Sequence, residues 1–154
     1  MEMSDLLDKH ILITGASKGL GSVCARALAE QGACLGLMAR TEDKLETLKM
    51  SLKNPKRHLC VTTDLMDIQQ LHIGIKKVKE FLKDIDVVLH VAGGGLGLRD
   101  TLLSSEDFIK LFTLNVVAAA EINRILVPEM VKRGKGNLVH IGSIASSEAA
   151  ASVG

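Results

Sequence analysis

Short apolar runs alternate with longer amphipathic segments along the whole chain. The longer segments carry apolar residues at helical spacing, and they cover residues 22–31, 41–53, 68–83 and 104–133. The apolar runs are typical of strands buried on both faces, and they cover residues 11–13, 33–39, 57–63, 86–91 and 137–141. Strands that alternate with helices in this way form a parallel sheet with right-handed crossovers. The pattern therefore predicts a single α/β domain over residues 1–154, with a doubly wound (Rossmann-type) parallel sheet. The sheet is expected to be incomplete on its C-terminal side, after the fifth strand.

The turn between the first strand and the first helix is rich in glycine. Gly15, Gly19 and Gly21 fall within eight residues, in the spacing T-G-x-x-x-G-x-G. Glycine lets the backbone turn tightly, and the first N–H groups of the helix that follows point toward any ligand in front of it. A plain tight turn could have the same composition. The position between a buried strand and a helix favours a phosphate-binding turn instead.

Composition and charge exclude several classes of protein. The net charge of +1 gives no electrostatic basis for binding nucleic acid or an anionic membrane. No uninterrupted apolar run reaches the roughly 18 residues of a bilayer-spanning helix, and the first nine residues contain no apolar signal segment. We therefore expect a cytoplasmic protein. Cys24, Cys34 and Cys60 match no metal-site spacing, so we expect them to be small buried thiols in a reducing compartment.

Two cations lie near the place where an adenosine ribose would be recognised. In NAD sites an acid near the end of the second strand binds the ribose hydroxyls, but Arg40 stands there in this chain. Arg40 and Lys18 could together face a 2′-phosphate, which favours NADP over NAD. The alternative is that both are solvated surface charges. Glu42 and Asp43 follow closely, but they fall in the first turn of a helix capped by Thr41, where acids complement the helix dipole.

With these features the sequence resembles the short-chain dehydrogenase/reductase family. The turn at residues 14–21 is similar to that family's cofactor turn. Further matches follow in order at Asp64-Leu65, Ala92-Gly93, Asn115 and Ser143, each after a predicted strand or within the long helix. The family usually carries two asparagines before Ala-Gly, where this chain has His90 and Val91. No metal site is expected at His90, because no other ligand stands at a useful spacing.

The resemblance implies an NADP-dependent oxidoreductase that interconverts a carbonyl and a hydroxyl of a small-molecule substrate by hydride transfer. Ser143 would polarise the carbonyl, and Asn115 would hold a water in a proton relay. The cofactor would be bound by Gly15, Ser17, Lys18, Gly19, Leu20, Arg40, Asp64, Leu65, Ala92 and Gly93. The family's proton-donating tyrosine, with a lysine four positions later, is absent from these 154 residues. We therefore expect both just past residue 154, in a protein of roughly 230 to 280 residues, and we expect the 154-residue chain alone to be inactive.

Two alternative functions remain open. The first is a non-catalytic NADP-binding sensor or partner protein, which would keep the fold and lack the tyrosine and lysine. The second is another doubly wound domain, such as an S-adenosylmethionine-dependent methyltransferase, which Lys18, Arg40 and Ser143 disfavour. Equilibrium binding of S-adenosylmethionine against NADPH would separate this second alternative from the oxidoreductase.

The helix predicted at residues 104–133 is apolar on more than one side. It begins with a capping-box pattern from Ser104 to Asp107, and a bend is expected near Pro128. One stripe holds Phe108, Leu111, Phe112, Asn115, Ala119 and Ile122, and the opposite face holds Ile109, Val116, Ala120, Leu126 and Val127. Asn115 alone could be a polar tie between helices. In the resembling family this helix pairs with its copy in a second subunit, so a homodimer or homotetramer is expected of the full-length protein.

Overall fold

The structure, a computed structural model, describes residues 6–98 and 102–144, and its strands form one parallel sheet in the order β3-β2-β1-β4-β5. The strands are β1 (His10–Thr14), β2 (Cys34–Ala39), β3 (Leu59–Thr62), β4 (Val87–His90) and β5 (Asn137–His140). The helices are α1 (Gly19–Glu30), α2 (Glu42–Ser51), α3 (Ile68–Leu82), α4 (Ser105–Phe112) and α5 (Ala118–Arg133). A 3-10 turn, η2 (Pro55–Arg57), precedes β3, and a π-helical turn, η3 (Thr113–Val117), joins α4 to α5.

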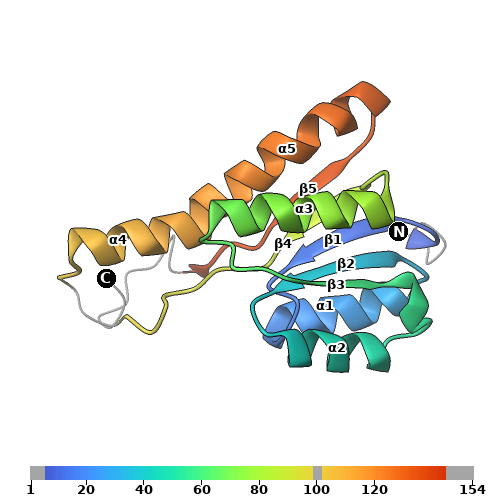
Figure 1. Cartoon of the computed structure of the whole chain (residues 1–154), viewed down its shortest axis with the longest axis horizontal. Coiled ribbons are helices and arrows are strands. Elements are labelled where there is room, and N and C mark those ends of the chain that lie inside the picture. The colour runs from blue at the N-terminus through green and yellow to red at the C-terminus, as the bar shows by residue number, and fades with distance from the viewer. Residues whose placement is uncertain (1–5, 99–101, 145–154) are drawn as a thin grey trace.

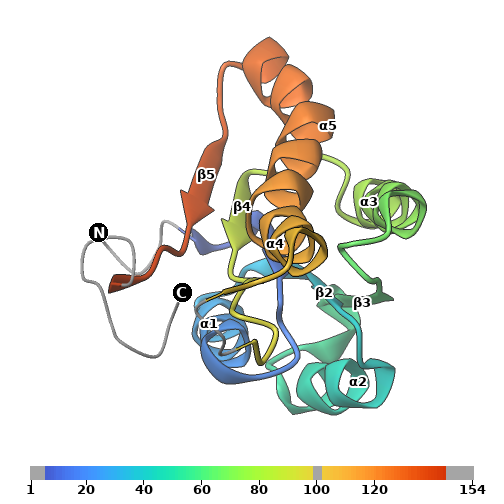
Figure 2. The same cartoon turned by 90° about the vertical axis from the view of Figure 1, so that its left-hand side faces the viewer.

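Helices cover both faces of the sheet. α1 and α2 lie on one face, and α3 and α5 lie on the other, as the two perpendicular views agree (Figures 1 and 2). The chain builds the sheet outward from β1 to β3, then crosses back to place β4 and β5 on the other side of β1. This is the predicted doubly wound arrangement. In such sheets ligands bind at the carboxyl ends of the strands where the order reverses, which here is between β1 and β4.

The two covered faces explain why the strands are apolar at successive positions. Side chains alternate between the faces of a strand, so Leu12 packs with α3 and α5 while Ile11 and Ile13 pack with α1 and α2. All three are buried. The three cysteines are free thiols, and each is partly buried, so the expectation that they are buried is met only in part.

Several element ends differ from the prediction by a few residues. α2 ends at Ser51 rather than at residue 53, because Leu52 takes an extended conformation and is buried in the core. Arg57 belongs to η2, so the third strand begins at Leu59 rather than at residue 57. The first of these shifts arises because tertiary packing of the apolar Leu52 side chain outweighs the local helical preference.

The long helix is irregular in its middle. Figure 1 shows that its axis changes direction between α4 and α5, where η3 lies. Pro128 lies inside α5, which continues as one α-helix past it, so the bend expected near Pro128 stays a prediction. The predicted cap is present, because the Ser104 hydroxyl accepts a hydrogen bond from the Asp107 N–H (3.1 Å). The irregular turn contains Asn115, and π-helical turns occur often at functional sites.

The buried stripe of this helix differs from the predicted one. Ala118, Ile122, Leu126 and Met130 recur every four residues and are buried against the sheet. Leu126 therefore shares a face with Ile122 instead of lying opposite it. Phe112, which was predicted to share that stripe, is exposed, because α4 extends beyond the edge of the sheet (Figure 1).

By length and composition alone, the segment Ser105–Arg133 could cross a membrane. Its mean hydropathy reaches 1.3 over 18 residues, and 17% of that window is buried. The expectation from the sequence concerned uninterrupted apolar runs, and this segment is interrupted by charged residues such as Glu121 and Arg124. In the structure α5 packs its buried stripe on the sheet, and core helices of globular proteins meet the same threshold.

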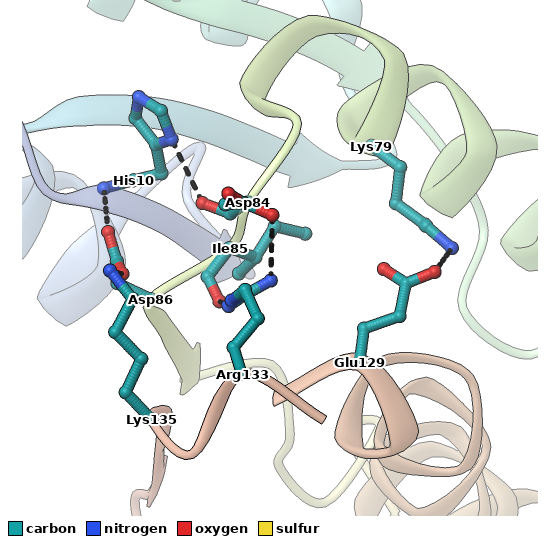
Figure 3. Close-up of polar contacts among 8 residues, drawn as sticks. All are labelled: His10, Lys79, Asp84, Ile85, Asp86, Glu129, Arg133 and Lys135. Atoms are coloured by element: carbon teal, nitrogen blue, oxygen red, sulfur yellow. Dashed lines mark hydrogen bonds and ion pairs between the residues drawn. The ribbon is translucent and has the colours of Figure 1, made fainter. Parts of the chain in front are cut away.

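Polar contacts fasten the amino-terminal edge of the sheet (Figure 3). At the end of α5, Arg133 donates to the Asp84 carboxylate over 3.0 Å. The Asp86 carboxylate accepts a hydrogen bond from the His10 N–H (3.1 Å) and forms an ion pair with Lys135 (3.2 Å). These contacts join β1, β4 and the α5–β5 connection at the edge opposite the strands' carboxyl ends.

Candidate functional site

A cleft of about 480 Å³ opens at the carboxyl ends of the strands. Its walls come from the segments that follow all five strands, with a contribution from η3. All ten residues predicted to bind the cofactor line it: Gly15, Ser17, Lys18, Gly19, Leu20, Arg40, Asp64, Leu65, Ala92 and Gly93. Seven further lining residues were not predicted from the sequence, namely Ala39, Thr41, Lys44, Thr63, Val91, Leu114 and Ile141. The volume is in the range of small-molecule and cofactor sites.

The glycine turn needs its glycines for different physical reasons. Gly15 has φ +69°, and a Cβ there would lie 2.8 Å from both the N and Cα of Ala92, so no side chain fits between the turn and the loop after β4. A Cβ at Gly21 would overlap the carbonyl group of Gly15. Gly19 has φ +53°, but a Cβ there would meet nothing within 4 Å, so its open side faces space that a ligand could use. The Thr14 hydroxyl accepts a hydrogen bond from the Ala92 N–H (3.2 Å) and fixes the same junction.

The N-terminus of α1 faces this cleft, and no acidic side chain of its first turn offsets the partial positive charge there. Lys18 occupies the N-cap in extended conformation, and its side chain makes no capping hydrogen bond. The first turn of α1 carries no acidic residue. The Ser22 hydroxyl donates to the Gly19 carbonyl oxygen (2.9 Å), which stiffens the turn. The leading N–H groups of a helix and its dipole favour an anion at this position.

Three cations lie on the side of the cleft formed by β2. Lys18, Arg40 and Lys44 all line it and are exposed to solvent. Lys44 was not predicted, although it lies in the first turn of α2, the helix that begins two residues after Arg40. Glu42 and Asp43 lie in the first turn of α2 and do not line the cleft. Among the described lining residues, the one carboxylate is that of Asp64, which follows β3.

Asp64 does not cap the helix that follows it. That role belongs to Asp67, whose carboxylate accepts hydrogen bonds from the N–H groups of Gln69 (2.9 Å) and Gln70 (3.1 Å). The Gln70 N–H bond in particular lowers the pKa of Asp67. The Asp64 carboxylate instead accepts from the Met66 N–H (3.0 Å) and holds the turn after β3 at the wall of the cleft. The Asp64 carboxylate thus belongs to the turn at the cleft wall, not to the start of α3.

Asn115 clamps the glycine loop that follows β4. Its Oδ1 accepts a hydrogen bond from the Gly94 N–H (2.8 Å), and its Nδ2 donates to the Gly94 carbonyl oxygen (3.1 Å). Nδ2 also donates to the Leu111 carbonyl oxygen (2.8 Å) within the helix. A Cβ at Gly93 would lie 2.7 Å from Asn115 Oδ1, so the loop approaches the amide closely. Asn115 therefore ties helix to loop, not helix to helix.

Ser143 follows the end of β5 and is exposed. Ile141, two residues before it, lines the cleft, and the Ile141 N–H donates to the His90 carbonyl oxygen (3.0 Å). The segment that carries Ser143 thus leaves the sheet at the edge where the cleft opens. The catalytic roles of Ser143 and Asn115 stay predictions.

A doubly wound parallel sheet, a glycine turn at a helix N-terminus and a cleft at the strand-order reversal define a Rossmann-type α/β domain. The chain belongs to the short chain dehydrogenase family, whose family model matches residues 9–154.

Comparisons with individual proteins agree with this assignment. The chain is 31% identical over 150 residues to the ketoacyl reductase HetN of Nostoc sp., covering 97% of this chain and 52% of that protein. It is 31% identical over 140 residues to the 3-ketodihydrosphingosine reductase of Bos taurus, covering 87% of this chain and 42% of that protein. A solved structure of 7α-hydroxysteroid dehydrogenase, complexed with NADH and 7-oxo glycochenodeoxycholic acid, matches with a TM-score of 0.90 at 25% identity, covering 99% of this chain and 60% of that one. The chain spans about half the length of the curated relatives it matches.

Proposed function

We propose that this chain is the cofactor-binding part of an NADP-dependent oxidoreductase that interconverts a carbonyl and a hydroxyl. The observation that carries the cofactor assignment is the group of three cations, Lys18, Arg40 and Lys44, around the end of β2. A 2′-phosphate carries about two negative charges, and lysine and arginine bind such groups through charge-assisted hydrogen bonds. An NAD site would favour an acid there to accept the ribose hydroxyls.

The residues present fit a dinucleotide. The glycine turn leaves open space at Gly19, the N-terminus of α1 favours a phosphate, and the loop at Ala92 and Gly93 has no bulk to block the far end of the cleft. When bound, NADPH supplies the hydride. The protein's contribution is to hold and orient the cofactor and to polarise the substrate.

The names of the relatives support the reaction class. Two are reductases of keto compounds, and the third is a hydroxysteroid dehydrogenase complexed with a 7-oxo compound. In this chain the Ser143 hydroxyl would donate a hydrogen bond to the substrate oxygen, which stabilises negative charge that develops there. Asn115 would order a water next to the glycine loop that it clamps. The proton donor is expected to be a tyrosine beyond Gly154, with a lysine four residues later that lowers its pKa.

The cofactor assignment is tested by binding in the full-length protein. NADPH should bind at least tenfold more tightly than NADH, which is about 1.4 kcal/mol. Arg40→Asp should erase or reverse this preference, because it puts a carboxylate where the phosphate would lie. Arg26→Asp is the matched control, since Arg26 is an exposed cation of α1 that does not line the cleft. Equal or tighter binding of NADH by the wild type would contradict the assignment.

The reaction class is tested by NADPH oxidation with ketone substrates, followed at the absorbance of the reduced nicotinamide. We expect turnover by the full-length protein, loss of kcat with Ser143→Ala, and no turnover by residues 1–154 alone. Tight NADPH binding without any turnover in the full-length protein would favour the alternative of a non-catalytic NADP-binding sensor.

We also propose that the full-length protein is a homodimer or homotetramer. Phe108, Ile109, Phe112 and Val116 form an exposed apolar surface on α4 and η3. Apolar surfaces of this kind usually mark an interaction site, and symmetric self-association is the commonest way to cover one. Sedimentation velocity should show an oligomer, and a stable monomer at micromolar concentration would contradict this.

A further inference from the structure

The turn between β3 and α3 carries the carboxylate that lines the cleft. Within this turn the Asp64 Oδ1 accepts a hydrogen bond from the Met66 N–H (3.0 Å), and the Asp64 carbonyl oxygen accepts one from the Asp67 N–H (3.1 Å). In the part of the chain that the structure describes, Asp64 Oδ2 accepts no hydrogen bond. One oxygen of this carboxylate is therefore committed to the turn, and the other can accept a hydrogen bond from a ligand.

Gln70, in the first turn of α3, holds this turn from the helix side. Its Oε1 accepts a hydrogen bond from the Asp64 N–H (3.2 Å), and its Nε2 donates to the Asp67 Oδ2 (2.9 Å). The Gln70 N–H also donates to the Asp67 Oδ1 (3.1 Å). One amide side chain thus joins the backbone of Asp64 to the carboxylate that caps α3. Gln70 does not itself line the cleft, so the cofactor assignment does not explain these bonds.

The chemistry at its two ends allows this amide one orientation. An amide oxygen only accepts a hydrogen bond, and an amide nitrogen only donates one. If the amide turned over, its nitrogen would face the Asp64 N–H and its oxygen would face the Asp67 carboxylate, and both contacts would be repulsive. The bond from the Gln70 N–H lowers the pKa of Asp67 most, and the bond from Nε2 lowers it further, so Asp67 stays a charged acceptor. A side chain that lacks either a donor or an acceptor cannot replace Gln70 here.

α3 reaches the turn because it packs closely on the end of β3. Gly74 lies one helical turn after Gln70, so the two residues share a face of α3. A Cβ at Gly74 would lie 2.6 Å from the Thr63 Oγ1, so the helix meets the strand end with no side chain between them. Thr63 is buried, and its N–H donates to the Ala39 carbonyl oxygen (2.9 Å). The residue before Asp64 is therefore fixed by the sheet, and Asp64 itself is fixed by Gln70.

The position of the Asp64 carboxylate indicates which part of a ligand it meets. Lys18, Arg40 and Lys44 lie around the end of β2, and Asp64 follows β3, the neighbouring strand. A carboxylate repels a phosphate but accepts a hydrogen bond from an amine. In a dinucleotide whose 2′-phosphate lies at the three cations, the adenine base is attached to the same ribose, and its exocyclic amine is such a donor.

We propose that Gln70 is a positioning residue for the cofactor, which holds the turn after β3 so that Asp64 Oδ2 accepts a hydrogen bond from the amine of the adenine. Gln70 thereby sets the preference of the cleft for an adenine base, although it does not touch the ligand. The hold of Gln70 on the turn is independent of the proposed function, whereas its effect on the base preference rests on that function.

The first test measures hydrogen exchange of backbone N–H groups by NMR in the full-length protein without cofactor. The Asp64 N–H should be protected in the wild type. Gln70→Met keeps a side chain of similar length without its donor and acceptor, so it should speed this exchange about tenfold and leave the Thr63 N–H unchanged. Gln69→Met is the matched control, because Gln69 is the preceding exposed glutamine of α3 and its side chain makes no hydrogen bond within the described residues.

Two results of this test would overturn the hold of Gln70 on the turn. One is an Asp64 N–H that exchanges in the wild type as fast as in an unfolded peptide, which is decisive even if the variant does not fold. The other is equal exchange of the Asp64 N–H in the wild type and in Gln70→Met.

The second test compares the binding of NADPH with that of reduced nicotinamide hypoxanthine dinucleotide phosphate, in which a carbonyl oxygen replaces the amine of the base. The wild type should bind NADPH about tenfold more tightly, because hypoxanthine presents an acceptor to the Asp64 carboxylate. Gln70→Met should reduce this ratio to about threefold or less, and Gln69→Met should keep it. A general loss of stability would weaken both dinucleotides equally and leave the ratio unchanged, so the ratio reports positioning alone.

A wild-type ratio near one, or a ratio that Gln70→Met leaves unchanged, would overturn the positioning role. Binding of neither dinucleotide would overturn the proposed function and the base preference with it. The exchange of the Asp64 N–H, measured without cofactor, separately decides whether Gln70 holds the turn.

Discussion

Replacing Gly15 with alanine tests how the cofactor turn is built. Gly15 and Gly19 both have positive φ, +69° and +53°, so alanine is strained at either position. They differ in the space around them. A Cβ at Gly15 would lie 2.8 Å from the backbone of Ala92, whereas a Cβ at Gly19 would meet nothing within 4 Å. Gly19→Ala is therefore a matched control that has the backbone strain without the steric overlap.

The expected losses of unfolding free energy follow from two terms, the backbone strain and the steric overlap. The left-handed conformation costs alanine about 1–2 kcal/mol, and this cost is shared by both variants. The β1 turn and the β4 loop must also move apart by about 0.6 Å in Gly15→Ala to reach an ordinary contact distance, and such overpacking adds about 1–3 kcal/mol. We therefore expect a loss of unfolding free energy of about 2–5 kcal/mol for Gly15→Ala and about 1–2 kcal/mol for Gly19→Ala.

The assay is urea denaturation of both variants beside NADPH titration in the full-length protein. The two variants should differ in these two measurements. Gly15→Ala should lose more stability, while Gly19→Ala should lose cofactor affinity beyond its loss of stability, because its methyl group enters the open side of the turn. Equal destabilisation by the two substitutions would refute the close approach of Gly15 to Ala92 as the reason for glycine at this position.

Two further predictions concern stability. Ile122→Ala should reduce the unfolding free energy by about 2–5 kcal/mol in urea denaturation, because Ile122 is fully buried where α5 meets the sheet, and a change below about 1 kcal/mol would contradict that packing. His58 is buried, its Nδ1 accepts from the Leu35 N–H (3.2 Å), and its Nε2 donates to the Lys53 carbonyl oxygen (2.9 Å), so the ring is held neutral. Burial lowers its pKa below 6.5, which means that the unfolded chain binds more protons and that stability is lost as the pH falls from 6.5. Unfolding midpoints measured from pH 7.5 to 5 should fall less steeply in His58→Gln, and an unchanged slope would contradict this assignment.

Local pattern was sufficient for the fold class and for much of the site. Apolar residues at successive positions require two covered faces, and strands that alternate with helices leave few topologies. The glycine turn, Asp64-Leu65 and Ala92-Gly93 all follow strands, and parallel strands end at the same edge. Their shared position on one cleft was therefore predictable from the order of elements alone.

The details that depend on distant partners were not predictable. The helix at residues 104–133 is apolar on several sides, so its periodicity could not select the stripe that meets the sheet or locate the π-helical turn. The amide of Asn115 bonds to Gly94, 21 residues away, and this contact exists only because the loop after β4 passes beside η3. From the sequence, an amide within an apolar stripe of a helix indicates only that it has some partner.

The amino-acid sequence by itself determined the order of strands and helices along the chain, the glycine turn and the cations at the ends of β1 and β2. These features depend on residues that are neighbours along the chain. The tertiary structure alone decided which strands lie side by side. The crossover that places β4 next to β1, and β5 next to β4, brings Gly15 against Ala92 and stacks His90 on His140. Periodicity specifies which face of a strand is buried, but it carries no information about strand order or register, and these set every contact across the site.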